Sequence, residues 1–243
     1  MSIVRKIKRR IWPQVRFRVD PNGTHRDFLV ASIEFLISRN LDSRQIVMFE
    51  VGTGGTSSQV MQSYLERFRQ MRLISFENDL KWLQTYKQDY PQSDRHSLVF
   101  VEGDSWTSTI KKYLDEVPED SKILTFIDSS PWESRIHALN LLKARSDLFL
   151  IHDVDYFPHN GLMGREIEPI RYAPANPFFY GRLKSKNLGM RDYDKVVRHW
   201  VEAFPRIPGY FTGPPTLIGS ENIDVNILEF PKGCIKQNNS SGA

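Results

Sequence analysis

The amino-acid sequence predicts an α/β protein built around a doubly wound, mostly parallel sheet. From about residue 45, short apolar segments alternate regularly with amphipathic segments of helical length. The apolar segments are nearly continuous runs, which is typical of parallel strands covered by helices on both faces. A length of 243 residues, with 40% apolar and 26% charged residues, fits one large α/β domain and excludes a disordered chain or a coiled coil.

Five parallel strands and the helices between them follow from this alternation. The predicted strands are residues 46–49, 73–76, 98–101, 123–127 and 148–151. The predicted helices are residues 57–69, a segment from about residue 80 that ends near Pro91, and residues 107–117 and 132–143. Each strand is thus joined to the next by one helix, which is the connection that parallel strands need.

A further helix and a long insertion flank these elements. Thr24-His25-Arg26-Asp27 resembles a capping box and predicts an N-terminal helix that lies across the sheet. Residues 154–190 hold four prolines and four glycines among aromatic residues. We expect this segment to be an irregular lid or substrate wall, and a disordered insertion is the alternative.

The C-terminal part is predicted to complete the sheet. A helix at residues 193–204 is followed by strands at 216–219 and 225–230, which brings the sheet to seven strands. Residues 233–243 are expected to form a flexible tail. The chain therefore reads as a single domain over residues 24–232.

Basic residues concentrate at the N-terminus. Seven of them precede the first acidic residue, Asp20, in an arm that we delimit as residues 1–23. Such an arm can contact phosphate or an anionic membrane surface, and a solvated or locally docked segment is the alternative. No apolar run approaches the ~20 residues that a membrane-spanning helix needs. Cys234 is the single cysteine, which excludes an intrachain disulfide and favours a cytoplasmic location.

A glycine-rich loop after the first strand carries the most specific pattern. Gly52-Thr53-Gly54-Gly55-Thr56 leads from that strand into the next helix. Glycine lets a ligand approach the backbone, and the N–H groups of a helix N-terminus favour an electron-rich partner. The dinucleotide pattern G-x-G-x-x-G is incomplete, because Ser57 holds its last position. Glu50, two residues before the first glycine, would repel a diphosphate and suits a ligand with a cationic amino acid group.

The sequence resembles the class I S-adenosylmethionine-dependent methyltransferases over about residues 45–155. Glu50-Val51-Gly52-Thr53-Gly54 matches their first motif, which reads acid, apolar, Gly, x, Gly. Glu77 ends the second strand, where that family places an acid that binds both ribose hydroxyls. Gly103-Asp104-Ser105-Trp106 ends the third strand, where the family contacts adenine, although Asp104 could instead cap the following helix.

This resemblance implies a Rossmann-like fold with an antiparallel C-terminal strand, and S-adenosylmethionine as the cofactor. The cofactor-binding residues that it implies are Glu50, Gly52, Thr53, Gly54, Ser58, Glu77, Asp104, Ser105 and Asp128.

Within that superfamily the sequence resembles small-molecule O-methyltransferases of the catechol, caffeoyl and macrolide-sugar kind. They also carry an acid at the end of strand four, here Asp128, and another at the end of strand five, here Asp153. In many of them these carboxylates hold a divalent cation that lowers the pKa of a substrate hydroxyl, so the resemblance implies a Mg²⁺ site. Val154 stands where the catechol enzymes have Asn, which makes Asp155 the candidate third ligand and leaves the need for a metal open.

A metal-free route is the alternative for the acceptor side. His152 would then act as a base beside Asp153, with Asp128 close by, and these three residues are the predicted catalytic groups. His152 could also be a buried residue at a strand end with no part in the chemistry. The other histidines and Cys234 show no metal-ligand spacing in the sequence, so no zinc site is predicted.

The leading hypothesis is a methyltransferase that acts on a hydroxyl of a small molecule or a sugar/glycan-type acceptor. The alternatives are a NAD-type oxidoreductase that uses the same loop, and a non-catalytic module that binds polyanions through its basic arm. Acids at four strand ends favour an enzyme, because a scaffold does not need them. The acceptor and the oligomeric state stay open, a homodimer included.

Overall fold

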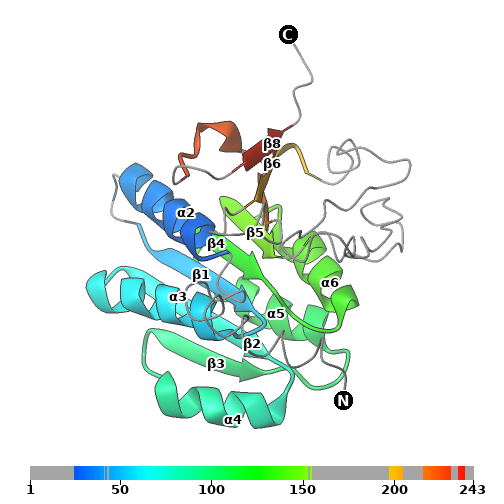
Figure 1. The fold of residues 1–243 in the computed structure, drawn as a ribbon. Helices are drawn as coiled ribbons and strands as arrows, with labels where there is room; N and C mark the ends of the chain where they lie inside the picture. The colour runs from blue at the N-terminus through cyan, green and yellow to red at the C-terminus, as the bar shows by residue number, and fades with distance from the viewer. Residues whose placement is uncertain are drawn as a thin grey trace, which may run out of the picture.

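In the part of the chain that the computed structural model describes, eight strands form one sheet, in the order β3-β2-β1-β4-β5-β7-β6-β8 (Figure 1). The structure describes residues 25–40, 42, 44–152, 154, 197–204, 216–230 and 235–238. The predicted arm at 1–23 lies outside these residues, and so does the predicted lid apart from Val154. The doubly wound, mostly parallel α/β fold that the sequence predicts is confirmed.

Strands β1 to β5 run parallel, and their carboxyl ends meet at one edge of the sheet. They are β1 (Ile46–Val51), β2 (Met71–Glu77), β3 (His96–Phe100), β4 (Lys122–Ile127) and β5 (Leu148–His152). The register pairs Val51 of β1 with both Phe76 of β2 and Ile127 of β4, so these three strands end at the same level. Glu77 and Asp128 therefore start from the same edge, on either side of β1.

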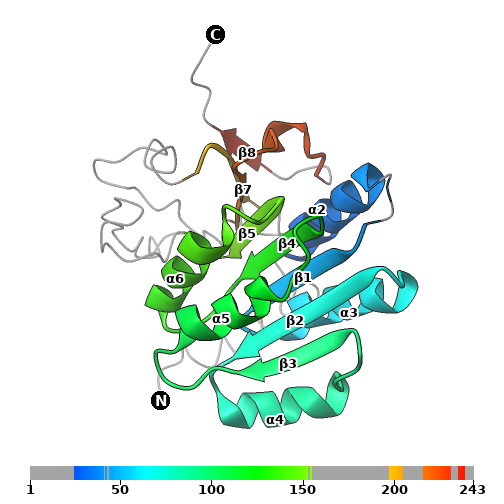
Figure 2. The ribbon, with the colours of Figure 1, turned by 180° about the vertical axis from the view of Figure 1, so that it is seen from behind.

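Helices cover both faces of this sheet (Figures 1 and 2). They are α2 (Arg26–Arg39), α3 (Gly55–Arg67), α4 (Leu80–Asp89), α5 (Trp106–Asp115) and α6 (Trp132–Leu142). Ile46 and Met48 of β1 belong to the core under α2 and α3, whereas Val47 and Phe49 belong to the core under α5 and α6. Because both faces are buried, β1 needs apolar side chains at successive positions, which explains its continuous apolar run. None of the described helices is both long and apolar enough to cross a membrane.

Three antiparallel pairings extend the sheet beyond β5. The added strands are β6 (His199–Phe204), β7 (Thr216–Ser220) and β8 (Ile235–Asn238). Strand β7 lies between β5 and β6 and runs against both, and β8 pairs with the free side of β6. The predicted strand at 216–219 is thus confirmed, and it is antiparallel to its neighbours.

The structure corrects three predictions in this C-terminal part. Residues 199–204, expected in a helix, form β6, because Trp200 faces one core while Val201 and Ala203 face the other, an alternation that suits a strand. The strand expected at 225–230 is replaced by a short 3-10 helix, η4 (Val225–Ile227). Residues 235–238, expected in a flexible tail, pair with β6, so the sheet has eight strands among the described residues where the sequence predicted seven.

The start of α2 also differs from the prediction. The proposed capping box places Thr24 at the N-cap, but His25 holds that position and makes no side-chain hydrogen bond to the helix. The imidazole of His25 instead packs on Phe126 of β4, with ring centroids 4.7 Å apart. This contact brings the N-terminus of α2 to the carboxyl edge of the sheet.

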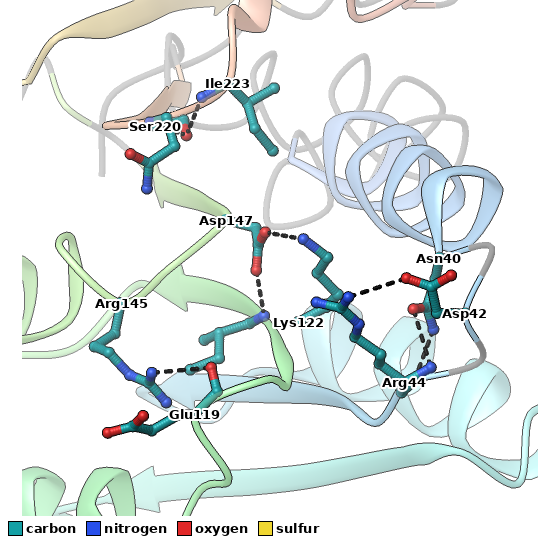
Figure 3. Close-up of polar contacts among 11 residues, drawn as sticks. Asn40, Asp42, Arg44, Glu119, Lys122, Arg145, Asp147, Ser220 and Ile223 are labelled. Carbon is teal, nitrogen blue, oxygen red and sulfur yellow. Dashed lines mark hydrogen bonds and ion pairs between the residues drawn. The ribbon is translucent and has the colours of Figure 1, made fainter.

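At the opposite edge, polar contacts fix the spacing between β4 and β5 (Figure 3). Lys122 Nζ donates to Asp147 Oδ1 at 2.8 Å, and the backbone N–H of Ile123 donates to Asp147 Oδ2 at 2.8 Å. Arg145 donates to the carbonyl oxygen of Glu119 at 3.2 Å, which ties the end of α6 to the turn before β4. These contacts fix the register between β4 and β5, and with it the relative position of their carboxyl ends.

Gly52, the first residue after β1, allows a close approach between two loops. Its backbone φ is +90°, a value that residues with a side chain rarely adopt. A Cβ at this position would lie 2.6 Å from Cα of Ser129 and 2.7 Å from the carbonyl carbon of Asp128. The glycine-rich loop can therefore pack directly on the backbone that follows β4.

Replacing Gly52 by alanine is expected to lower the free energy of unfolding by at least about 2 kcal/mol, because the backbone strain and the clash add. Gly55→Ala is the matched control: a Cβ there meets nothing within 4 Å, so we expect a change of no more than about 1 kcal/mol. Urea unfolding followed by circular dichroism measures both, and equal midpoints would contradict this account of Gly52.

Candidate active site

The predicted site residues gather around the loop between β1 and α3. This loop contacts Glu77 of β2 on one side and the backbone of Asp128 on the other. Glu50 of β1 lies beneath it. Of the four acids predicted at strand ends, the structure therefore brings three together, and Asp153 lies outside the described residues.

Glu50 is fully buried, with 0% of its surface exposed. Its carboxylate accepts hydrogen bonds from the hydroxyls of Ser57 at 2.7 Å, Ser58 at 2.6 Å, Ser75 at 2.7 Å and Tyr86 at 3.3 Å. Burial raises the pKa of Glu50, and the four hydroxyl donors act in the opposite direction. The sequence predicted that Glu50 contacts the ligand, but in the structure its carboxylate holds the first turn of α3 in place.

This buried polar cluster continues to His96, which sequence reasoning did not place near the loop. Ser75 Oγ lies 3.2 Å from His96 Nε2, and Gln62 Nε2 lies 2.7 Å from His96 Nδ1. His96 is 1% exposed, and burial lowers its pKa. The polar groups beneath the loop thus form one network that joins α3, α4 and the first three strands.

Glu77 holds the same loop from the side. Its Oε2 accepts from the backbone N–H of Thr53 at 3.2 Å and from the Thr53 hydroxyl at 2.6 Å. Its Oε1 accepts from the backbone N–H groups of Asn78 at 2.9 Å and Asp79 at 2.8 Å. A ribose hydroxyl that binds Glu77 therefore has to replace the hydroxyl of Thr53.

The loop after β3 keeps its predicted acid exposed. Ser105, and not Asp104, is the N-cap residue of α5, so the alternative in which Asp104 caps this helix is wrong. The Ser105 hydroxyl donates to the carbonyl oxygen of Glu102 at 2.6 Å. Trp106 is 2% exposed in the core under α5 and α6, which excludes it from a ligand-facing wall.

Arg135, on α6, joins the ends of β4 and β5 and was missed by sequence reasoning. It is 5% exposed and donates to Asp128 Oδ1 at 2.7 Å, to the carbonyl oxygen of Ser129 at 2.8 Å and to the carbonyl oxygen of His152. Burial raises the pKa of Asp128 to about 6, although the charge of Arg135 and its hydrogen bond lower it. The Asp128 side chain is still 27% exposed, so it can meet a ligand.

Two histidines meet beside Asp128. The rings of His25 and His152 have centroids 4.4 Å apart, and each residue is 3% exposed. Burial, followed by the charges of His25 and Arg135, lowers the pKa of His152 well below its ordinary value. Spacing along the sequence did not indicate this pair, and the structure brings the two rings together because the N-terminus of α2 lies against β4 and β5.

The magnesium site expected at Asp128, Asp153 and Asp155 has one member among the described residues. Around Asp128, those residues supply the imidazoles of His25 and His152 and the guanidinium of Arg135. Magnesium prefers oxygen ligands, and the other two predicted carboxylates, Asp153 and Asp155, lie outside the described residues, so the magnesium site stays a prediction.

Comparison with known proteins finds matches among solved structures only. No family model matches the sequence, and no curated protein matches it. A probable spermidine synthase from Corynebacterium glutamicum is 15% identical with a TM-score of 0.43, and the match covers 83% of this chain and 66% of that one. A DUF519 protein from Legionella pneumophila is 10% identical with a TM-score of 0.45, covering 84% and 86%. Coclaurine N-methyltransferase bound to N-methylheliamine and SAH is 8% identical with a TM-score of 0.28, covering 52% and 35%.

All three TM-scores are below 0.5. The chain also spans slightly less than two thirds of the length of the Corynebacterium protein, at 66%. The function proposed below therefore rests on the residues of the site.

Glu50→Gln is expected to change how stability depends on pH. A carboxyl whose pKa is raised by folding destabilises the fold when it ionises, so the wild type should lose stability relative to Glu50→Gln as the pH rises above 4.5. Urea unfolding of both proteins between about pH 5 and pH 8 measures this difference. A difference that stays constant, or that grows in favour of the wild type, would contradict a raised pKa.

Arg135→Lys is expected to lower the free energy of unfolding by about 2 kcal/mol or more, because one ammonium cannot span the three acceptors that the guanidinium reaches. Arg44→Lys is the control, since Arg44 is 43% exposed and pairs with an exposed Asp42. We expect it to change stability by less than about 1 kcal/mol. Similar urea midpoints for the two variants would show that Arg135 does not tie the strand ends together.

Proposed function

We propose that this chain is an S-adenosylmethionine-dependent methyltransferase that acts on a hydroxyl oxygen of a small molecule or a sugar/glycan-type acceptor. The observation that carries the proposal is the position of Glu77, at the end of β2 and in contact with the glycine-rich loop. In open α/β sheets, ligands bind at the carboxyl edge where the strand order reverses, here next to β1. A carboxylate at this place can accept both hydroxyls of a ribose.

The N-terminus of α3 supports a donor with an amino acid carboxylate. Gly54 is the N-cap residue and supplies no side-chain hydrogen bond to the first turn. A Cβ at Gly55 would meet nothing within 4 Å, so there is space above this turn. The N–H groups and the dipole of a helix N-terminus favour a negative group in such a place.

Exposed apolar side chains near Glu77 support a site for the adenine ring. Leu80 is 54% exposed, Trp82 is 43% exposed and Phe100 is 40% exposed. Trp82 Nε1 donates to the carbonyl oxygen of Thr53 at 3.1 Å, and Phe100 is paired with Glu77 in the sheet register. A bound purine would cover part of this surface and remove it from water.

Asp128 is our candidate for the group that takes the acceptor's proton. In a direct displacement, the acceptor oxygen bonds to the methyl carbon while the bond from sulfur to that carbon breaks, and the hydroxyl proton passes to a base. Asp128 lies against the loop, is partly exposed, and with a pKa of about 6 is ionised at neutral pH. His152 is 3% exposed and less accessible to an acceptor, and Asp153 stays a second candidate.

The alternatives have weaker support. In a dinucleotide-binding loop, Ser57 would be the third glycine, but its hydroxyl bonds to the buried Glu50 and fills this place. A polyanion-binding role depends on residues 1–23, which lie outside the described part of the chain.

Glu77→Gln is expected to weaken the binding of S-adenosylhomocysteine by about 10- to 100-fold, because an amide nitrogen replaces one of the oxygens that accept ribose hydroxyls. Isothermal titration calorimetry without added metal measures the affinity. Glu66→Gln, an exposed position on α3, is the control and should bind as the wild type does. An unchanged affinity for Glu77→Gln, or tighter binding of NAD than of S-adenosylhomocysteine by the wild type, would eliminate the proposal.

A further inference from the structure

Three metal-ligating side chains converge at the carboxyl edge of β4 and β5. His25 precedes α2, Asp128 follows β4 and His152 ends β5. One ligand atom from each lies within 4.8 Å of the ligand atoms of the other two. We infer that His25, Asp128 and His152 form a binding site for a divalent transition metal ion, with Zn²⁺ as the ion that fits best.

The two imidazoles are held in place by the surrounding fold. The His25 ring packs on Phe126, and Thr216 Oγ1 lies 3.4 Å from His152 Nδ1. A polar contact on one ring nitrogen orients the other nitrogen toward a metal. Both histidines are 3% exposed, so an ion between them would be shielded from water on that side.

The donor set selects the kind of ion. Two imidazole nitrogens and one carboxylate oxygen suit Zn²⁺ and similar first-row ions, whereas Mg²⁺ needs oxygen ligands. Three protein ligands leave at least one position for water or a substrate oxygen, which is typical of catalytic sites and not of structural ones.

Arg135 strengthens this selection. It pairs with Asp128 Oδ1 at 2.7 Å, while a carboxylate has a second oxygen that can bind an ion. The guanidinium charge offsets the carboxylate charge, so the site attracts cations weakly by charge alone. Ions that bind mainly by charge, such as Mg²⁺, are therefore disfavoured against ions that bind imidazole.

The site goes beyond donor binding, and it gives Asp128 a second candidate role. An ion held there would lie beside the loop that contacts Asp128, where a hydroxyl acceptor could bind it. Binding to the ion would lower the pKa of that hydroxyl so that its proton could pass to solvent water, and Asp128 would then be a ligand and not the base.

Calorimetric titration of the full chain with Zn²⁺, without donor or acceptor, tests the inference. We expect His25→Ala and His152→Ala each to weaken Zn²⁺ binding by about 100-fold or more, since loss of an outer-shell partner alone costs 10- to 100-fold. His137→Ala is the matched control, because His137 is exposed on α6 and should leave Zn²⁺ binding unchanged. A large excess of Mg²⁺ should not displace Zn²⁺.

X-ray absorption of the wild-type Zn²⁺ complex keeps the inference testable even where a variant fails to fold. We expect two imidazole ligands with the remaining scattering from oxygen. Failure of the wild type to bind Zn²⁺, bound Zn²⁺ without imidazole ligands, affinity unchanged in both alanine variants, or displacement by Mg²⁺ would each overturn it. Because S-adenosylhomocysteine binding is measured without metal, failure of this inference is distinguishable from failure of the proposed methyltransferase.

Discussion

Two glutamates hold the glycine-rich loop from different sides, and the layout of the candidate site depends on these bonds. Glu50 lies beneath the loop and binds the hydroxyls of Ser57 and Ser58, while Glu77 lies beside it and binds Thr53. Burying a carboxylate is costly unless hydrogen-bond donors surround it, and both glutamates accept four hydrogen bonds. These bonds fix the loop, and a ribose hydroxyl that binds Glu77 has to replace one of them, the bond from the Thr53 hydroxyl.

A second set of contacts connects this loop to the carboxyl ends of β4 and β5. Gly52 packs on the backbone after β4, and Arg135 links that backbone to the end of β5. The loop after β1 and the ends of β4 and β5 are thus connected by direct contacts. Their chemistry differs, because carboxylates surround the loop whereas imidazoles and a guanidinium surround Asp128.

The parallel part of the fold could be predicted because each element carries its own pattern. The strands from β1 to β5 are buried on both faces, so they appear as apolar runs, and the helices between them show one apolar face. The C-terminal strands do not carry such an apolar run. Residues 199–204 alternate between two cores that are themselves built from distant segments, so local periodicity did not separate a strand from a helix.

The candidate site was predictable only as positions along the chain. Residue type, spacing and the family resemblance were enough to place Glu50 on the first strand, Glu77 at the end of the second and Asp128 at the end of the fourth. They were not enough to show that both glutamates bond to the loop itself, or that Arg135 pairs with Asp128.

By itself, the sequence determined the order of strands and helices in the parallel half, the glycine at the tight turn after β1 and the acids at the strand ends. These features are local, because periodic burial and backbone conformation are set by neighbouring residues. Only the tertiary structure decided which partner each buried polar group takes, and that His25 meets His152. Such partners come from segments far apart in the chain, and they become neighbours only when the helices pack on the sheet.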